Sequence, residues 1–198
     1  MFAQALTEII GRLDEAQALG LVEQFALIGG FAVSAWGVPR ATHDLDFALA
    51  LGSQEPTTLA RSLQAEFHAG DPTDPLRGVF RTTISVKSRS IPAQFILLPS
   101  IWSSIVFRKI VSLPVFGTSV PVVSWQSLIL LKLYAGGPQD LVDAQQVLVA
   151  RRPTESERQE LYRWLRRWAS QKRGARSIIP RSQGGYQYNP FVATVDFS

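Results

Sequence analysis

The sequence contains no cysteine and only two histidines, His43 and His68. Without thiols the chain forms neither disulfides nor thiolate metal sites, and two histidines are too few for a histidine-rich zinc centre. Any metal ion bound by this protein is therefore expected to be held by oxygen ligands.

Long hydrophobic runs are also absent. The apolar stretch at residues 127–135 is interrupted by Lys132 and is too short to span a bilayer. Glu8, Asp14 and Glu15 stand where a secretory signal peptide would have a basic start followed by apolar residues. We therefore expect a soluble, cytoplasmic protein with no membrane partner.

The composition suits one globular domain, because 46% of the 198 residues are hydrophobic and 18% are charged. Charge is distributed unevenly: residues 1–150 hold 10 Lys/Arg and 12 Asp/Glu, whereas residues 151–198 hold 10 and 4. The basic C-terminal quarter could steer the protein towards RNA, DNA or an acidic protein, or it could be a solvated helix face with a basic tail.

Hydrophobic periodicity and turn residues predict an α/β (α+β) protein. Helices are expected at residues 2–19, 31–36, 57–67, 101–110, 124–134 and 138–149, with a last helix after Thr154. Strands are expected at residues 25–28, 44–50, 78–86 and 93–98, with a hairpin that turns at Gly117 and Thr118. Ser124 is expected to cap one helix, and Thr154 with Glu157 forms a capping-box pattern for the last one.

Two aspartates, Asp44 and Asp46, lie two residues apart on a predicted strand, so both carboxylates point to the same side. Two like charges this close raise the pKa of one acid unless a cation compensates. A divalent ion, Mg²⁺ or Mn²⁺, bound together with substrate phosphates meets that need.

Upstream of the acids, Gly29 and Gly30 stand where a predicted strand turns into a helix. This geometry lets backbone amides approach phosphate oxygens. Either half alone is a weak signal, since Gly-Gly turns are common and paired acids also occur on solvated strand edges. The two halves in this order, with 13 residues between them, predict a nucleotide site.

Residues 27–47, LIGGFAVSAWGVPRATHDLDF, resemble the signature of DNA polymerase β-like nucleotidyltransferases. Within that superfamily the chain is most similar to the AbiEii-type group, many of whose members are toxins of bacterial toxin–antitoxin pairs. Residues 124–144, SWQSLILLKLYAGGPQDLVDA, resemble the second signature of this group.

The resemblance implies a nucleotidyltransferase fold with a small mixed sheet flanked by helices. This domain is expected at residues 1–150, with a basic amphipathic helix at 151–173 packed on it and an irregular tail at 174–198. The resemblance also implies an NTP substrate, a Mg²⁺ or Mn²⁺ cofactor, a protein or RNA acceptor and a possible antitoxin partner.

The resemblance carries over roles in three sets: Gly29, Gly30, Arg40 and Thr42 for the nucleotide, Asp44 and Asp46 for the metal, and Lys132, Asp140 and Asp143 for the second motif beside the cleft. Lys132 would join the two metal-binding aspartates as a catalytic residue. Simpler readings stay open for some of them. Arg40 could be an exposed arginine and Thr42 a residue that starts a strand. Asp140 and Asp143 could serve to stabilise the start of a helix.

One expected group is missing. The superfamily has a third carboxylate on a later strand, but Gln94 stands at that position and residues 75–139 contain no Asp or Glu. Gln139 likewise stands where the second signature usually has Lys. An amide oxygen is a weak Mg²⁺ ligand and cannot accept the acceptor's hydroxyl proton at neutral pH.

Three functions follow from this pattern. The first is an enzyme that moves a nucleoside monophosphate from an NTP to a hydroxyl of a protein or RNA. The second is a degenerate nucleotidyltransferase that binds a nucleotide or a partner without turnover, because Gln94 replaces the third acid. The third is a structural interaction domain, which would require the acidic strand to be accidental. The first is favoured by the intact Gly-Gly and Asp-x-Asp motifs.

Overall fold

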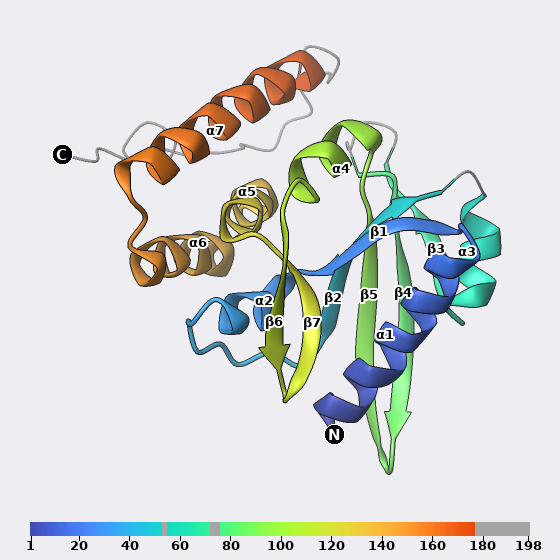
Figure 1. Cartoon of the computed structure of the whole chain (residues 1–198). Coiled ribbons are helices and arrows are strands. Elements are labelled where there is room, and N and C mark those ends of the chain that lie inside the picture. The colour runs from blue at the N-terminus through green and yellow to red at the C-terminus, as the bar shows by residue number, and fades with distance from the viewer. Residues whose placement is uncertain (53–54, 72–75, 177–198) are drawn as a thin grey trace.

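The computed structural model describes residues 1–52, 55–71 and 76–176, which form seven helices and seven strands (Figure 1). The helices are α1 (Phe2–Ala18), α2 (Gly29–Ala35), α3 (Pro56–Ser62), α4 (Ser100–Val106), α5 (Trp125–Ala135), α6 (Pro138–Arg151) and α7 (Glu155–Arg176). The strands are β1 (Val22–Leu27), β2 (Leu45–Leu51), β3 (Glu66–Ala69), β4 (Gly78–Val86), β5 (Arg89–Leu97), β6 (Ile110–Val115) and β7 (Thr118–Val123).

All seven strands form one mixed sheet in the order β3-β4-β5-β2-β1-β7-β6. β2 runs parallel to β5 and β1 runs parallel to β7, while the other neighbours are antiparallel. The central strand β2 is apolar at nearly every position because helices cover both of its faces. The predicted mixed sheet flanked by helices is confirmed.

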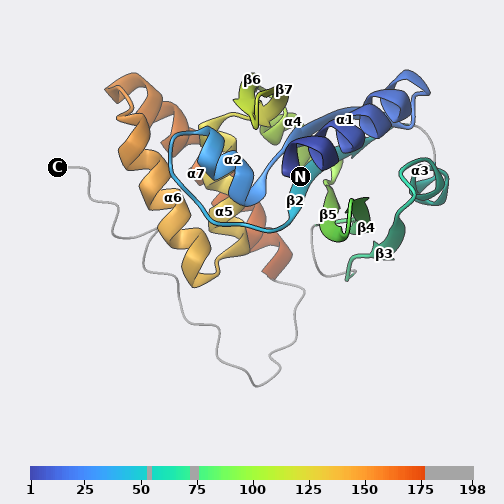
Figure 2. The ribbon, with the colours of Figure 1, turned by 90° about the horizontal axis from the view of Figure 1, so that it is seen from below.

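One face of the sheet packs against α1 and α3, and α2, α5 and α6 lie on the other side (Figure 2). Phe47, Phe95 and Phe80 are register partners on three neighbouring strands and are fully buried on the α1 side. Each buried phenylalanine contributes about 2–3 kcal/mol through the hydrophobic effect. This aromatic row fixes which side chains of β2, β4 and β5 point to the opposite face.

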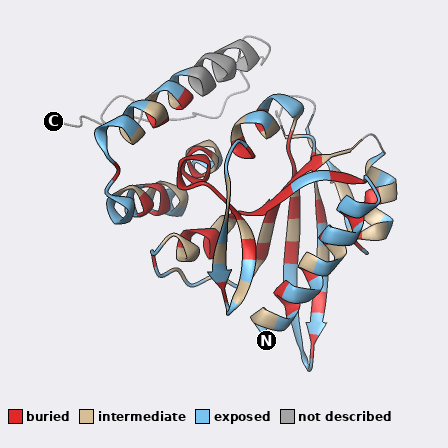
Figure 3. Ribbon diagram, viewed as in Figure 1, coloured by how far each residue is buried: buried red, intermediate tan, exposed pale blue. Residues whose placement is uncertain are grey.

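The helix α5 is buried along most of its length, which its nearly all-apolar sequence requires (Figure 3). Its predicted cap is confirmed, because Ser124 Oγ accepts a hydrogen bond from the backbone N–H of Ser127 at 3.2 Å. The helix ends at Gly136, whose φ of +68° is in the left-handed region. This turn brings α6 back against α5.

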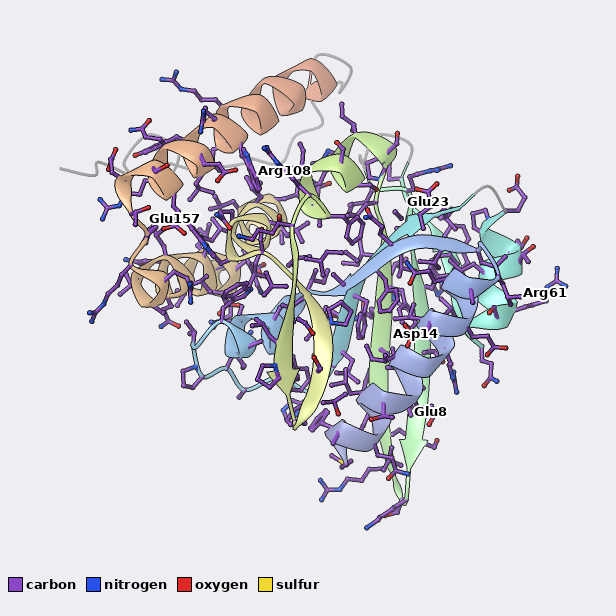
Figure 4. The ribbon with its side chains drawn as sticks, viewed as in Figure 1. Glu8, Asp14, Glu23, Arg61, Arg108 and Glu157 are labelled. Atoms are coloured by element: carbon purple, nitrogen blue, oxygen red, sulfur yellow. The ribbon has the colours of Figure 1, made fainter. Side chains whose placement is uncertain are left out.

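The helix α7 starts at Glu155, directly after Thr154 as predicted. Thr154 and Glu157 form the expected capping box, with Thr154 Oγ1 accepting from the Glu157 N–H at 3.3 Å. Trp164 is buried, and the guanidinium of Arg108 lies over its ring at 5.4 Å, so α7 contacts the segment after α4 (Figure 4). The helix continues to Arg176, and the rest of the predicted tail, residues 177–198, lies outside the described residues.

Two predicted helices are wrong in extent. The helix expected at 57–67 ends at Ser62, and Glu66–Ala69 form β3 instead. Gln64 takes a left-handed φ of +51° that stops the helix, and the Phe67 ring then packs on Phe80, with centroids 4.8 Å apart. The helix expected at 101–110 ends at Val106, because Ile110 pairs with Val123 in the sheet. Pairing with the next strand along the chain outweighed local periodicity in both cases.

No helix within residues 1–52, 55–71 and 76–176 is long and apolar enough to cross a membrane.

Candidate functional site

The two aspartates of the Asp-x-Asp motif lie at the start of β2. Asp44 directly precedes the strand and accepts a hydrogen bond from Thr42 Oγ1 at 3.0 Å, while Asp46 lies within the strand. Both are half-buried. Burial, together with the charge of Asp44, raises the pKa of Asp46 to about 6, although the nearby charge of Lys132 lowers it. A cation bound between Asp44 and Asp46 would offset the repulsion between their negative charges.

The Gly-Gly turn packs directly on Asp46 and on Thr42. Gly29 has a φ of +66°, and a Cβ at this position would collide with the carboxylate of Asp46. A Cβ at Gly30 would lie 2.8 Å from the Cβ of Thr42. Glycine is therefore required at both positions by close approach, and the two halves of the motif meet in space.

The residues of the second signature form a buried ionic cluster. Lys132 Nζ, on α5, donates to Asp140 Oδ1 at 2.9 Å and to Asp143 Oδ2 at 2.8 Å, both on α6. Arg40 Nε donates to Asp143 Oδ1 at 3.1 Å, and Gln139 Nε2 donates to the same oxygen at 2.9 Å. Arg40 is thus neither freely exposed nor directed at the aspartate pair, and it ties the loop before β2 to α6.

Asp143 is the centre of this cluster because its side chain has no exposed surface. Burial by itself raises the pKa of Asp143. The hydrogen bonds from Lys132 and Gln139 and the charges of Lys132 and Arg40 lower it by more, so the pKa of Asp143 is below its ordinary value. Burial lowers the pKa of Lys132, and its two aspartate partners raise it by more. The cluster therefore stays ionised, and its lysine acts on Asp46 through space.

Gln94 lies beside Asp46 of the aspartate pair. β2 and β5 are parallel neighbours in which Asp46 and Gln94 are register partners, so both side chains point to the same face of the sheet. The residue that stands where the resemblance leads us to expect a third carboxylate is therefore adjacent to Asp46, and it carries an amide. Among the described residues no group of three or more His, Cys, Asp or Glu side chains could hold a metal ion.

Residues 13–184 match the family described as nucleotidyl transferase AbiEii toxin, type IV toxin–antitoxin system. The chain belongs to the AbiEii family. The match extends beyond the two signatures in both directions.

Two solved structures are similar to this chain. An antigenic nucleotidyltransferase-like protein from Paracoccidioides brasiliensis has a TM-score of 0.52 and 15% identity, covering 86% of this chain and 89% of that chain. The antibiotic-resistance factor ANT(2'')-Ia has a TM-score of 0.49 and 11% identity, covering 88% of this chain and 98% of that chain. No curated protein matches the sequence. The first of these similarities supports the nucleotidyltransferase fold for this AbiEii-family protein.

The sequence did not lead us to predict one residue near the site of this AbiEii-family protein. Arg81 on β4 is the register partner of Gln94, so it lies on the same face as Gln94 and Asp46. The alternation of β4 carries the signal, since Phe80 and Ile84 are apolar and the residues between them are polar. Only the pairing of β4 with β5 shows that the polar side of β4 lies on the same face of the sheet as Asp46 and Gln94.

Proposed function

We propose that this AbiEii-family protein transfers a nucleoside monophosphate from an NTP to a hydroxyl group of a protein or RNA, with Mg²⁺ or Mn²⁺. We further propose that it acts in the cytoplasm as a toxin restrained by an antitoxin. The close approach of Gly29 to Asp46 supports this proposal, because backbone amides that could bind phosphate lie next to a carboxylate that could bind a metal ion.

The aspartate pair fits a divalent ion. Asp44 and Asp46 supply hard oxygen ligands, and neither forms an ion pair with a described residue. The raised pKa of Asp46 reflects a half-buried carboxylate next to another negative charge, a strain that a bound cation would relieve. A bound metal would offset the charge of the phosphates and polarise the phosphoryl group.

The protein's own residues then position and hold the nucleotide. Thr42 orients Asp44 through its hydrogen bond, and the backbone amides at Gly29 and Gly30 have the close approach that phosphate oxygens need. Lys132, held by two aspartates, adds fixed positive charge near Asp46. Arg40 and Asp143 keep the loop that carries Thr42 against α6.

A second function, nucleotide or partner binding without turnover, is favoured by one observation. Gln94 occupies the position next to Asp46 where the superfamily has its third carboxylate. An amide cannot accept a proton from an attacking hydroxyl at neutral pH. If catalysis occurs, the acceptor hydroxyl must lose its proton to another group or to water.

The deciding experiment incubates the purified protein with labelled NTPs, Mg²⁺ or Mn²⁺ and a cell extract. Transfer predicts covalent label on a macromolecule, and treatment with protease or ribonuclease then identifies the acceptor class. The double variant Asp44→Ala/Asp46→Ala should give no label. If the wild-type protein binds NTP but labels nothing with either metal, the result supports nucleotide or partner binding without turnover.

A further inference from the structure

The outward side of α6 carries two exposed valines. Val142 and Val149 are 43% and 68% exposed, and they share one side of the helix because seven residues make two turns. The other large hydrophobic residues exposed in the described part of the chain lie at the two ends of α1, on α4 and in the β6–β7 turn: Met1, Leu19, Ile101 and Phe116. Two such residues on one helical side indicate a contact surface more strongly than a single exposed side chain does.

The same side of α6 is uncharged. Gln145 and Gln146 lie between the two valines, and both are exposed. Within residues 141–150 the one charged residue is Asp143, whose side chain has no exposed surface. A surface helix ordinarily turns charged residues towards water, whereas the centre of a protein interface is depleted in them. We call this surface the α6 face, and it consists of Val142, Gln145, Gln146 and Val149.

A groove runs beside the α6 face. Gln145, Gln146 and Val149 line it on one side, and residues 37–39, in the loop after α2, line it on the other. α6 and this loop lie side by side at the outside of the molecule (Figure 2). A helix laid along the α6 face would therefore also contact the loop.

The two ends of α6 carry opposite charges. Asp140 lies in the first turn and is half-buried, whereas Arg151 and Arg152 end the helix and are exposed. Arg151 stays exposed although its guanidinium lies 5.0 Å from the centre of the Trp36 ring. The helix dipole adds partial charges of the opposite order, positive at the first turn and negative at the last. An antiparallel copy of the same helix complements both the side-chain charges and the dipole.

We propose that the α6 face is the interface with a second copy of this chain, in which the two α6 helices pack antiparallel about a two-fold axis. With the axis at the middle of the face, between residues 145 and 146, Val142 packs against the partner's Val149. The same register brings Asp140 near the partner's Arg151. Because the chain has a net charge of +4, an uncharged face is also where two copies approach with least repulsion.

The interface is small. From its first residue to its last, α6 extends about 21 Å, and a standard interface buries about 800 Å² on each partner. We therefore expect a reversible dimer that forms at micromolar concentrations. Such a dimer does not depend on nucleotidyl transfer, so its test needs neither nucleotide nor metal.

Sedimentation velocity of the full chain from about 1 to 200 µM measures the association. The weight-average sedimentation coefficient should rise from that of a monomer towards that of a dimer. Val149→Arg places a charge in the interface and should weaken the dimer at least roughly tenfold. Leu19→Arg is the matched control, since Leu19 is 64% exposed at the end of α1. Circular dichroism checks that each variant is folded, and Val142→Arg replaces Val149→Arg if that variant is not.

Cysteine cross-linking tests the antiparallel register. The chain has no cysteine, so an introduced thiol can form a disulfide only with its copy in a second chain. Gln146→Cys lies next to the proposed axis and should cross-link on mild oxidation. Val142→Cys should not, because its two copies lie about 10 Å apart along the helices, beyond the reach of about 7 Å between the Cα atoms of a disulfide.

Association of the wild type that is weakened by Val149→Arg and kept within twofold by Leu19→Arg, together with cross-linking of Gln146→Cys, supports the proposal. A wild type that stays monomeric over the whole range overturns it and leaves the α6 face to a different protein. Equal association of wild type and Val149→Arg overturns it as well. Stronger cross-linking of Val142→Cys than of Gln146→Cys contradicts the antiparallel arrangement.

Discussion

At the scale of single residues, Asp46 has the environment that most needs a cation. Burial and the adjacent Asp44 raise its pKa to about 6, although its unfolded value is 3.8. The folded protein therefore binds a proton at Asp46 more tightly than the unfolded chain does. Without metal, stability falls as the pH rises from about 4 through 6, where the carboxylate ionises in the folded state.

Asp46→Asn should remove this loss. In EDTA the variant should be more stable than wild type above pH 7, by about 1–3 kcal/mol for a half-buried group, and the difference should vanish near pH 4. Urea unfolding at several pH values measures it. A difference that is independent of pH would show that ionisation of Asp46 does not destabilise the fold. Asp14→Asn on the surface of α1 serves as the control (Figure 4).

Gln94 is the second informative residue, because one atom distinguishes it from the expected acid. Gln94→Glu keeps the shape and adds a carboxylate beside Asp46. The metal-free variant should melt below wild type through repulsion, and Mn²⁺ should reverse that order. A weak transferase should also become faster by about 10² to 10⁴ through general-base help.

Gln94→Met, which has a similar shape and no oxygen, is the control for that experiment. It should show neither the lower metal-free melting temperature nor the stronger response to Mn²⁺. If Gln94→Glu also changes neither metal response nor activity, the side chain at 94 does not reach the metal.

At the scale of elements, the turn from β1 into α2 depends on close packing against β2. Gly29→Ala adds both a left-handed strain at φ +66° and a collision with the Asp46 carboxylate. Gly37→Ala, at φ +94° with open space around it, adds only the strain. We expect a loss of about 1 kcal/mol for Gly37→Ala and about 2–4 kcal/mol for Gly29→Ala, measured by denaturant unfolding. Equal losses would contradict the collision.

The contact between α5 and α6 depends on a buried acid. Asp143→Asn leaves Lys132 and Arg40 without their fully buried partner and should cost about 3–5 kcal/mol. Asp140→Asn removes the half-exposed partner of the same lysine and should cost no more than about 1 kcal/mol. Thermal unfolding of both variants at pH 7 compares them. A larger loss for Asp140→Asn would contradict the central place of Asp143 in the cluster.

At the scale of the whole molecule, ligand binding should stabilise the fold by mass action. An NTP with Mg²⁺ at about 100 times its Kd adds about 2.7 kcal/mol, which is a rise of roughly 5 °C or more in Tm for a domain of this size. Differential scanning fluorimetry measures it, and Asp44→Ala should abolish it. A wild-type protein that shows no nucleotide-dependent shift at millimolar ligand would remove the main support for the site.

Much of the site could be predicted because its signals are local. Gly29 and Gly30 lie in a turn whose tightness only glycine permits, and Asp44 and Asp46 share a side because a strand repeats every two residues. The cap at Ser124 is likewise local, because its hydrogen bond joins residues only three positions apart.

Tertiary structure decided what joins distant segments. Arg40 reaches Asp143 across 103 residues of sequence, and no local pattern specifies that pair. Glu66–Ala69 became a strand because β4 offered a partner, although the local sequence predicted a helix. Arg81 gained its place beside Gln94 and Asp46 through the register of three strands. Local sequence determined the motif and its turn, whereas pairing energies between segments far apart in the chain decided its neighbours, because register depends on the whole sheet.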